Sequence, residues 1–239
     1  MDVAEFEQGL ECLKAPRDLW ELILDFFAQG PIVRVLYHHV PPMGAIDGTR
    51  VKVFGHGLPE EFLHFYSAAR LYRQNPRFQR AFRIVDPFYF DDVTPEAAAD
   101  KVAFAETIGR LEFERGLGVP VFGPMGRNGY AGLGFAPGVE RLPPETVLDV
   151  QWVCQLAHLR YCEFLLEDHG PPPKLSARET EILGWVARGK SNASIADILG
   201  ISPHTVDAHL RRTYGKLGVF DRISAAIRGI GIGLIHADS

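Results

Sequence analysis

The pattern of apolar and polar positions predicts both helices and strands in the first 140 residues. Apolar residues recur at helical spacing in three segments, which predicts helices over residues 17–28, 59–71 and 95–117. Segments rich in β-branched and aromatic residues predict strands over residues 32–40, 50–54, 119–122 and 130–135. The order of these elements predicts an α/β domain, with an antiparallel or mixed sheet and helices on its faces.

The longest helical pattern covers residues 145–167 and ends at the strongest break in the chain. Its apolar positions repeat over about six turns, at Val147, Val150, Val153, Leu156, Leu159, Cys162, Leu165 and Leu166. Such a stripe predicts either a dimer face or burial within the helix's own domain, and the pattern leaves both open. Residues 171–173 are three prolines, which cannot continue a helix because each lacks a backbone donor. We therefore predict an N-terminal domain over residues 1–169, a linker over 170–174 and a C-terminal domain over 175–239.

Residues 175–239 carry start and stop signals for four helices. Ser176 and Glu179 have the spacing of a capping box, and Ser202 followed by Pro203 is another strong helix start. Glycines at positions 200 and 218 fit helix ends in the left-handed conformation. Two short helices, a glycine-containing turn and a third, basic helix are typical of a helix-turn-helix, whose recognition helix enters the major groove of DNA.

The third helix and the segment before it supply the candidate DNA contacts. Backbone amides at the start of a helix attract a phosphate, while basic side chains flank the groove. Thr205 and His209 are candidates for contacts with phosphate or bases, and Val206 is open between a thymine methyl and the protein core. The predicted DNA-binding residues are Lys190, Ser202, Thr205, Val206, His209, Arg211, Arg212 and Lys216.

The charge of the chain divides between the two predicted domains. The formal net charge of −5 argues at first against a nucleic-acid partner. Residues 174–239, however, carry nine Lys and Arg against six Asp and Glu, which is a net charge of +3. Residues 1–173 carry 16 basic and 24 acidic side chains, a net charge of −8. This asymmetry is typical of a two-part molecule with one part facing nucleic acid.

The cysteines and the apolar runs indicate the compartment. Cys12, Cys154 and Cys162 are an odd number without a CxxC pair, which fits reduced thiols better than a disulfide scaffold. No apolar run approaches the roughly 20 residues that a membrane span needs. The prediction is a cytoplasmic protein with no membrane partner.

The C-terminal segment resembles the DNA-binding domain of the LuxR family over about sixty residues. The resemblance rests on three groups of residues: Leu175-Ser176-x-Arg178-Glu179; Gly189-Lys190, Ile195-Ala196 and Ile201-Ser202; and Thr205-Val206-x-x-His209 with Lys216-Leu217-x-Val219. It implies an all-α, four-helix domain that binds double-stranded DNA, and in two copies a pseudo-palindromic promoter site. Arg212 stands where this family usually has Asn.

The N-terminal segment resembles the acyl-homoserine-lactone-binding domain of the same regulators. The resemblance rests on Phe62-x-x-x-Tyr66, Asn75-Pro76, Phe90 and Gly118-x-Pro120-x-x-Gly123. It implies an α-β-α sandwich with a central antiparallel sheet and a ligand pocket between the sheet and one helical layer. The ligand-binding residues that it implies are Phe62, Tyr66, Asn75, Pro76, Phe90, Gly118 and Gly134.

Three positions depart from that pattern and bear on the ligand. Phe62 replaces a Trp and has no donor, Asn75 replaces an Asp, and Gly134 replaces a Ser or Thr. Three interpretations therefore stay open: an acyl-homoserine lactone held in a modified way, a different small molecule, or no ligand at all. The resemblance predicts a homodimeric transcription regulator, and leaves open whether it activates or represses.

Other classes of protein fit the sequence less well. A phosphoreceiver would begin with a strand ending in an acidic pair, whereas residues 1–30 are predicted to be helical. The histidines at positions 38, 39, 56 and 64 form no HxxxH or HExxH pattern, and the acidic residues at 86, 91 and 92 fit a loop. We therefore predict no enzyme, no catalytic residue, no metal and no cofactor beyond a small-molecule signal. A ligand-free adaptor that contacts RNA polymerase is a further alternative.

Overall fold

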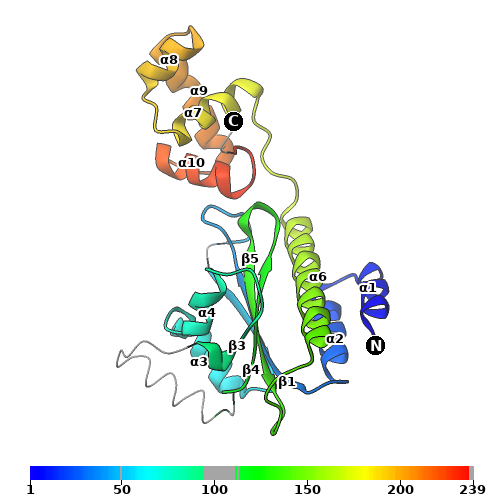
Figure 1. Ribbon diagram of the computed structural model, residues 1–239. Helices are drawn as coiled ribbons and strands as arrows, with labels where there is room; N and C mark the ends of the chain where they lie inside the picture. The colour runs from blue at the N-terminus through cyan, green and yellow to red at the C-terminus, as the bar shows by residue number, and fades with distance from the viewer. Residues whose placement is uncertain (49, 94–110, 112, 237–239) are drawn as a thin grey trace. The chain divides into compact units, whose positions relative to one another are not determined.

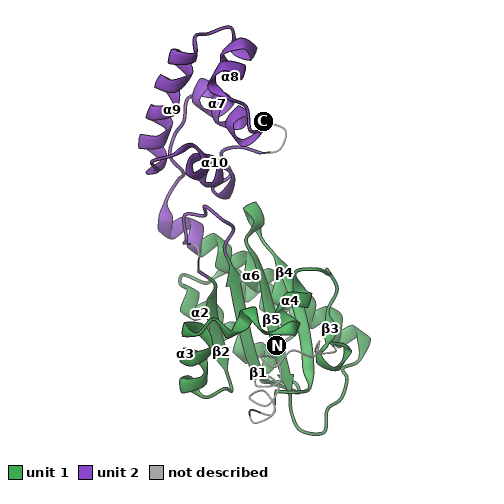
Figure 2. Ribbon diagram, turned by 90° about the vertical axis from the view of Figure 1, so that its left-hand side faces the viewer, with its two compact units in different colours: residues 1–40, 51–164 green, residues 41–50, 165–239 purple. Residues whose placement is uncertain are grey.

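The computed structural model describes residues 1–48, 50–93, 111 and 113–236, which form two compact units. Unit 1 comprises Met1–Val40 and Val51–Phe164, and unit 2 comprises Pro41–Arg50 and Leu165–Ser239 (Figure 2). Each unit is described by itself. None of the helices in the described ranges combines the length and apolarity that crossing a membrane requires.

Unit 1 is built on an antiparallel sheet in the order β2-β1-β5-β4-β3. The central strands β1 (Ile32–Val40) and β5 (Asn128–Phe135) pair along most of their length, from Ile32 opposite Phe135 to Val40 opposite Asn128. The outer strands are β2 (Lys52–His56), β4 (Gly116–Phe122) and the two-residue β3 (Phe88–Tyr89). The α/β fold is confirmed, and the sheet that the pattern left open between antiparallel and mixed is antiparallel.

Helices cover both faces of this sheet (Figure 1). One face carries α2 (Pro16–Phe27) and α6 (Pro144–His169), and α1 (Val3–Glu11) packs beside α2. The other face carries α3 (Glu60–Ala68) and α4 (Pro76–Ala81). Because side chains alternate along a strand, the sheet supplies a separate core to each helical layer. The core below α2 and α6 contains Phe27, Val35 and Leu133, whereas the core below α3 contains Leu36 and Tyr66.

Two of the predicted helices of unit 1 have ends that differ clearly from the expected ones. The helix expected over residues 59–71 ends at Ala68, because Arg70 adopts a left-handed conformation with φ 54° before a short 3₁₀ turn at Leu71–Arg73. The helix expected over residues 95–117 falls largely outside the described residues. Its expected end is wrong, since Gly116 and Leu117 lie in β4 and pair with Gly134 and Leu133.

The long helix α6 uses part of its predicted apolar stripe inside unit 1. Val150 and Val153 on this helix are buried, as is Cys162 further along it. Leu159 of the stripe remains 38% exposed. Two apolar side chains outside the predicted stripe are also exposed, Leu148 at 64% and Trp152 at 50%. Burial within the domain therefore explains most of the stripe, and a second apolar face of α6 is left at the surface.

Unit 2 contains the four helices that the capping signals predict. They are α7 (Ala177–Ala187), α8 (Asn192–Leu199), α9 (Pro203–Leu217) and α10 (Arg222–Gly231). The Ser176 and Ser202 side chains accept from the amides of Glu179 and Thr205, as expected of N-caps. Gly200 and Gly218 end α8 and α9 in the left-handed conformation. Local sequence signals therefore define this helix-turn-helix.

We expect Gly134→Ala to lower the free energy of unfolding of unit 1 by about 1–3 kcal/mol. A Cβ at this position would lie 2.5 Å from Cδ2 of Phe113, and this ring is buried and has little room to move. Urea denaturation followed by tryptophan fluorescence measures the effect, because Trp20 and Trp152 both lie in unit 1. Gly30→Ala is the control, since its Cβ would meet only Phe27 O at 3.8 Å. An equal stability of both variants would contradict the close packing at Gly134.

Candidate nucleic-acid interface and ligand-binding residues

The helix α9 separates a core face from a polar face. Its core face is formed by buried residues at helical spacing: Val206, Leu210, Thr213 and Leu217. Four of the predicted DNA-binding residues, each one position before a core residue, line the adjacent stripe: Thr205, His209, Arg212 and Lys216. The sequence left Val206 open between DNA and the core, and its complete burial places it in the core.

The start of α9 presents the groups that a phosphate or a base edge would meet. Ser202 Oγ accepts from the Thr205 amide at 3.1 Å and also lies 2.9 Å from Thr205 Oγ1. The two hydroxyls therefore share one hydrogen bond at the exposed first turn. Lys190, just after α7, is exposed, and its backbone carbonyl accepts from the guanidinium of Arg222. Ser202 and Thr205 thus define one end of the polar face.

The three basic side chains near the end of α9 have different partners. Arg211 forms an exposed ion pair with Asp207, at 2.9 Å and one turn apart. Within the described ranges, the structure gives Arg212 no ionic partner, which leaves its guanidinium available to a phosphate. Lys216 Nζ instead lies 2.6 Å from the carboxylate of Glu179 on α7. Arg212 is therefore the side chain of the three that is best placed for DNA.

The partner of Lys216 is a buried carboxylate that sequence reasoning recognised only as a helix cap. Glu179 is 3% exposed, and its carboxylate also accepts from the Ser176 amide at 2.7 Å. Burial alone would raise the pKa of this carboxyl, but the bonds from Lys216 and Ser176 lower the pKa to about 2. Lys216 therefore holds α9 against α7, a role that the spacing of the capping box does not reveal.

In unit 1, the structure brings Tyr66 and Asn75 together beside His38 of β1. Asn75 Nδ2 donates to Tyr66 Oη at 3.2 Å, and His38 Nε2 lies 3.0 Å from the same oxygen. Burial lowers the pKa of His38 to about 3, so the ring is neutral. His38 Nδ1 faces the Tyr130 carbonyl at 3.4 Å and is assigned the proton, so Nε2 accepts from the Tyr66 hydroxyl.

Tyr66 and Asn75 use most of their hydrogen-bond donors and acceptors within the protein. The Tyr66 proton goes to His38, and one lone pair of the Tyr66 oxygen accepts from Asn75. The Asn75 carbonyl oxygen accepts from the amides of Arg77 and Phe78, and so caps α4 directly before Pro76. The side-chain carbonyl of Asn75, a predicted ligand-binding residue, therefore stabilises the start of α4.

Aromatic rings pack around this polar group. Phe62 lies 5.4 Å from Tyr66 between ring centroids, and Phe90 lies 5.4 Å from Phe113. Gly118 and Gly134 make room for rings, because a Cβ at Gly118 would lie 2.4 Å from Cζ of Phe88 and one at Gly134 would meet Phe113. Tyr66, Asn75, Phe62 and Phe90 thus lie in one layer, between the sheet and α3, with the two glycines in the sheet beneath it.

A buried group of metal-type ligands lies on the opposite face of the sheet. The ligand atoms of His39, His158 and Cys162 lie within 4.8 Å of one another. His158 already has two partners: Nδ1 accepts from the Tyr37 hydroxyl at 2.6 Å, and Nε2 donates to the Arg127 carbonyl at 2.8 Å. Burial lowers the pKa of His158 to about 4. The bonds to Tyr37 and Arg127 give this histidine a structural role.

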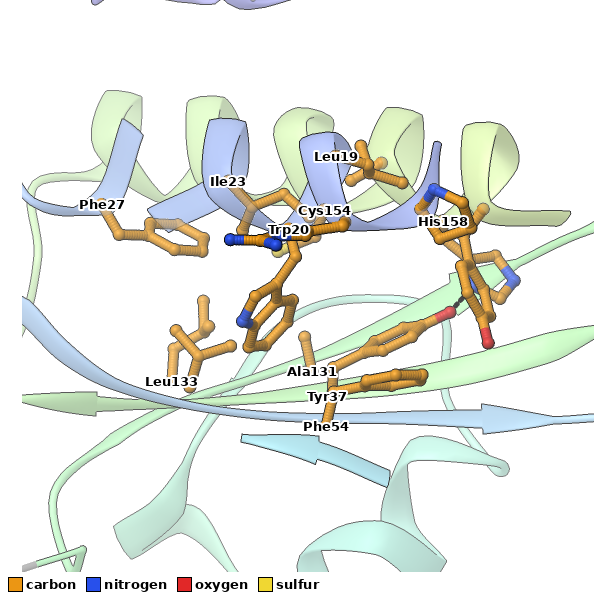
Figure 3. Close-up of a pocket in the computed structure, with 15 residues that line it drawn as sticks. Leu19, Trp20, Ile23, Phe27, Tyr37, Phe54, Ala131, Leu133, Cys154 and His158 are labelled. Atoms are coloured by element: carbon orange, nitrogen blue, oxygen red, sulfur yellow. Dashed lines mark hydrogen bonds between the residues drawn. The ribbon is translucent and has the colours of Figure 1, made fainter. Parts of the chain in front are cut away.

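The same face holds an apolar cavity of about 310 Å³ between the sheet and the helices α2 and α6 (Figure 3). Leu19, Trp20 and Ile23 line it from α2, and Cys154 and Ala157 line it from α6. None of the predicted ligand-binding residues lines this cavity. Sequence reasoning missed it, because its walls come from segments more than a hundred residues apart.

Comparison with known proteins identifies both parts of the chain. Residues 15–161 match the family model of the autoinducer binding domain, which covers more than half of the chain. Residues 173–228 match the model of bacterial regulatory proteins of the luxR family. The chain belongs to the LuxR family. The resemblances read from the motifs are thus confirmed, and this protein is a LuxR-type transcription regulator with an autoinducer-binding domain.

One relative of this LuxR-type regulator is a transcriptional activator by name, and solved structures of SdiA share the fold of this chain. The transcriptional activator protein AhyR of Aeromonas hydrophila is 28% identical over 187 residues, covering 74% of this chain and 71% of AhyR. The crystal structure of Escherichia coli SdiA superposes with a TM-score of 0.78 at 20% identity, covering 98% of each chain. A structure of SdiA in complex with octanoyl-rac-glycerol reaches a TM-score of 0.67 at 21% identity and covers 98% of this chain and 93% of SdiA.

Lys216→Met is expected to destabilise unit 2 by about 1–3 kcal/mol, because Glu179 would stay buried without its cation. Hydrogen exchange of the backbone amides in α7 and α9 measures this loss in the full chain. Arg211→Met, which removes the same charge from an exposed pair, should change the protection by less than about 0.5 kcal/mol. Equal protection in wild type and Lys216→Met would show that Lys216 is free for DNA.

Proposed function

We propose that this regulator binds a pseudo-palindromic DNA site as a homodimer, with α9 of each copy in the major groove. The observation that carries the proposal is the division of α9 into a core face and an adjacent polar stripe. A helix-turn-helix needs this division, because its second helix must pack on the domain and present side chains to base edges at the same time.

The residues of this stripe would contact different parts of the DNA. The first amides of α9, beside Ser202 and Thr205, face a phosphate, since a helix N-terminus favours negative charge. His209 lies one turn further along the stripe, at a position suited to base edges. Arg212, where the family usually has Asn, supplies an additional phosphate contact, and Lys190 lies exposed beyond α7.

Replacing Arg211 and Arg212 by Ala should weaken binding to a promoter fragment. It should also weaken the salt dependence: the negative slope of log affinity against log salt concentration should become shallower by about 1 for each phosphate that is no longer neutralised. Arg212→Ala should account for most of the effect, since Arg211 is shared with Asp207. Fluorescence anisotropy of a labelled fragment at several salt concentrations measures both quantities.

The matched control removes one arginine from unit 1. Arg115 forms an exposed ion pair with Glu140, as Arg211 does with Asp207, so Arg115→Ala makes the same charge change away from α9. If Arg115→Ala and Arg212→Ala lost affinity equally, total charge rather than α9 would explain DNA binding. If Arg212→Ala lowered the protection of the α9 amides, its loss of affinity would reflect misfolding.

The dimer is proposed to form through the exposed apolar face of α6. Leu148, Trp152 and Leu159 lie on one side of this helix, at spacings of four and seven residues. Phe122 at the end of β4 is 40% exposed and lines the same hollow as Leu148 and Trp152. A second copy is the occupant that fits, because a two-fold DNA-binding protein needs a two-fold interface.

Leu148→Asp is expected to shift the protein from dimer to monomer, because the carboxylate would be buried without a partner in the interface. Light scattering coupled to gel filtration gives the mass directly. Val85→Asp is the control, because Val85 is an apolar side chain of similar exposure, 65% against 64% for Leu148, away from α6. A dimer that survives Leu148→Asp but not Val85→Asp would place the interface elsewhere.

The signal is proposed to be an uncharged acyl-type molecule rather than an ordinary lactone. The family match supports small-molecule control, and the SdiA complex with octanoyl-rac-glycerol offers an acyl ligand without a lactone. In this chain the Tyr66 hydroxyl and the Asn75 carbonyl are already bonded within the protein, so they offer less to a lactone and its amide.

A regulator without any ligand is the second candidate, and the hydrogen bonds of Tyr66 and Asn75 within the protein favour it. Mass spectrometry of small molecules retained by protein purified from its own host separates the two. A stoichiometric acyl compound without a lactone supports the proposed signal, and a stoichiometric homoserine lactone overturns the argument from Tyr66 and Asn75. No retained molecule supports the second candidate.

A further inference from the structure

The cavity between the sheet and the helices α2 and α6 has walls from the sheet and from both helices (Figure 3). Trp20 and Ile23 extend from α2 toward the sheet, and Ala131 and Leu133 of β5 form the floor. Ala157 of α6 lines the cavity from the helical layer. Its volume of about 310 Å³ lies at the lower end of the range for small-molecule sites, roughly 300–1,000 Å³.

Tyr37 and His158, two polar side chains in the wall, are neutral and bonded within the protein. Tyr37 donates to His158 Nδ1, and His158 in turn donates to the Arg127 carbonyl. Burial raises the pKa of the Cys154 thiol to about 12, so this group is also uncharged at neutral pH. A charged ligand group would therefore lie against neutral walls, which costs free energy that no partner there returns.

Charges are confined to the rim of the cavity. Arg17, in the first turn of α2, has a side chain that is 86% exposed and pairs with Glu21 at 3.0 Å. Phe54 on the edge strand β2 is 39% exposed and lies 6.1 Å from Trp20 between ring centroids. The exposed part of the lining thus includes the start of α2 and the sheet edge, and the Arg17–Glu21 pair carries no net charge.

Trp20 gives the cavity one specific donor. Its indole lies under α2 above Ala131 and Leu133 (Figure 3). For its Nε1–H, the structure shows no hydrogen-bond partner within residues 1–48, 50–93, 111 and 113–236. An indole N–H can only donate, so the complementary ligand atom is an acceptor oxygen.

We propose that this cavity is a binding site for an uncharged, largely apolar molecule with one acceptor oxygen, held by apolar contact and by the Trp20 N–H. The inference goes beyond the proposed function, because this site lies on the face of the sheet opposite Tyr66 and Asn75. It also links the ligand to assembly, since α6 lines the cavity with Ala157 and exposes Leu148 and Trp152 on another side.

The test follows the indole N–H signals of the three tryptophans in ¹⁵N-labelled full-length protein, with 2-octanone as the probe. The Trp20 signal is expected to shift in a saturable way, while the signals of Trp152 and Trp185, which do not line the cavity, stay in place. The variant Trp20→Phe assigns the Trp20 signal. Sodium octanoate at the same concentrations should leave the Trp20 signal unmoved, because its carboxylate would face the neutral walls.

Two substitutions from different elements fill the cavity and keep the test decisive if one of them fails to fold. Ala157→Leu on α6 and Ile23→Phe on α2 should each weaken the 2-octanone titration at least tenfold. Tyr72→Phe, a conservative change in the core on the opposite face of the sheet, should leave the titration unchanged. A titration that survives both filling variants, disappears in Tyr72→Phe, or is matched by octanoate overturns the inference, as does the absence of any Trp20 shift.

The result of this titration does not decide the DNA-binding proposal. Promoter affinity depends on α9 of unit 2, whereas the indole titration reports on unit 1. Normal DNA binding together with an unmoved Trp20 signal would therefore reject the cavity and retain the DNA-binding function.

Discussion

The pairing of β1 with β5 at the centre of the sheet is the constraint on which unit 1 depends. Both strands are covered on both faces, so consecutive residues of β1 enter different cores. Tyr37 points to the side of α2 and α6, where it bonds to His158, and His38 points to the side of α3, where it bonds to Tyr66. A shift of the register by one residue would exchange the two environments and leave both hydrogen bonds unmade.

Much of unit 2 could be predicted from the sequence because its signals are local. The bounds of α9 follow from Ser202, Pro203 and Gly218, which lie within or beside the helix that they start or end. Unit 1 was predicted in outline only. The two-residue strand β3 has too little length for a pattern, and the expected end of the helix over residues 95–117 was wrong because Gly116 and Leu117 pair with β5.

The sites show the same division between local and distant information. The polar stripe of α9 follows from helical spacing alone. The partner of Lys216 lies 37 residues away and the partner of His38 lies 28 residues away, so no short pattern joins either pair. Trp20 and Ala157 are further apart still, and only the folded sheet brings them to one cavity. The family resemblance identified Tyr66 and Asn75 as candidates. It could not reveal that their hydrogen bonds are made to other groups of the protein.

The contact between Lys216 and Glu179 joins the last turn of α9 to the first turn of α7. Glu179 also closes the cap of α7, so one carboxylate holds the entry of unit 2 and the far end of its recognition helix together. Tilting α9 relative to α7 would separate a buried charge from its counter-ion, which makes such a tilt unfavourable. Any displacement of the recognition helix would therefore carry α7 with it and leave the shape of this helical bundle unchanged.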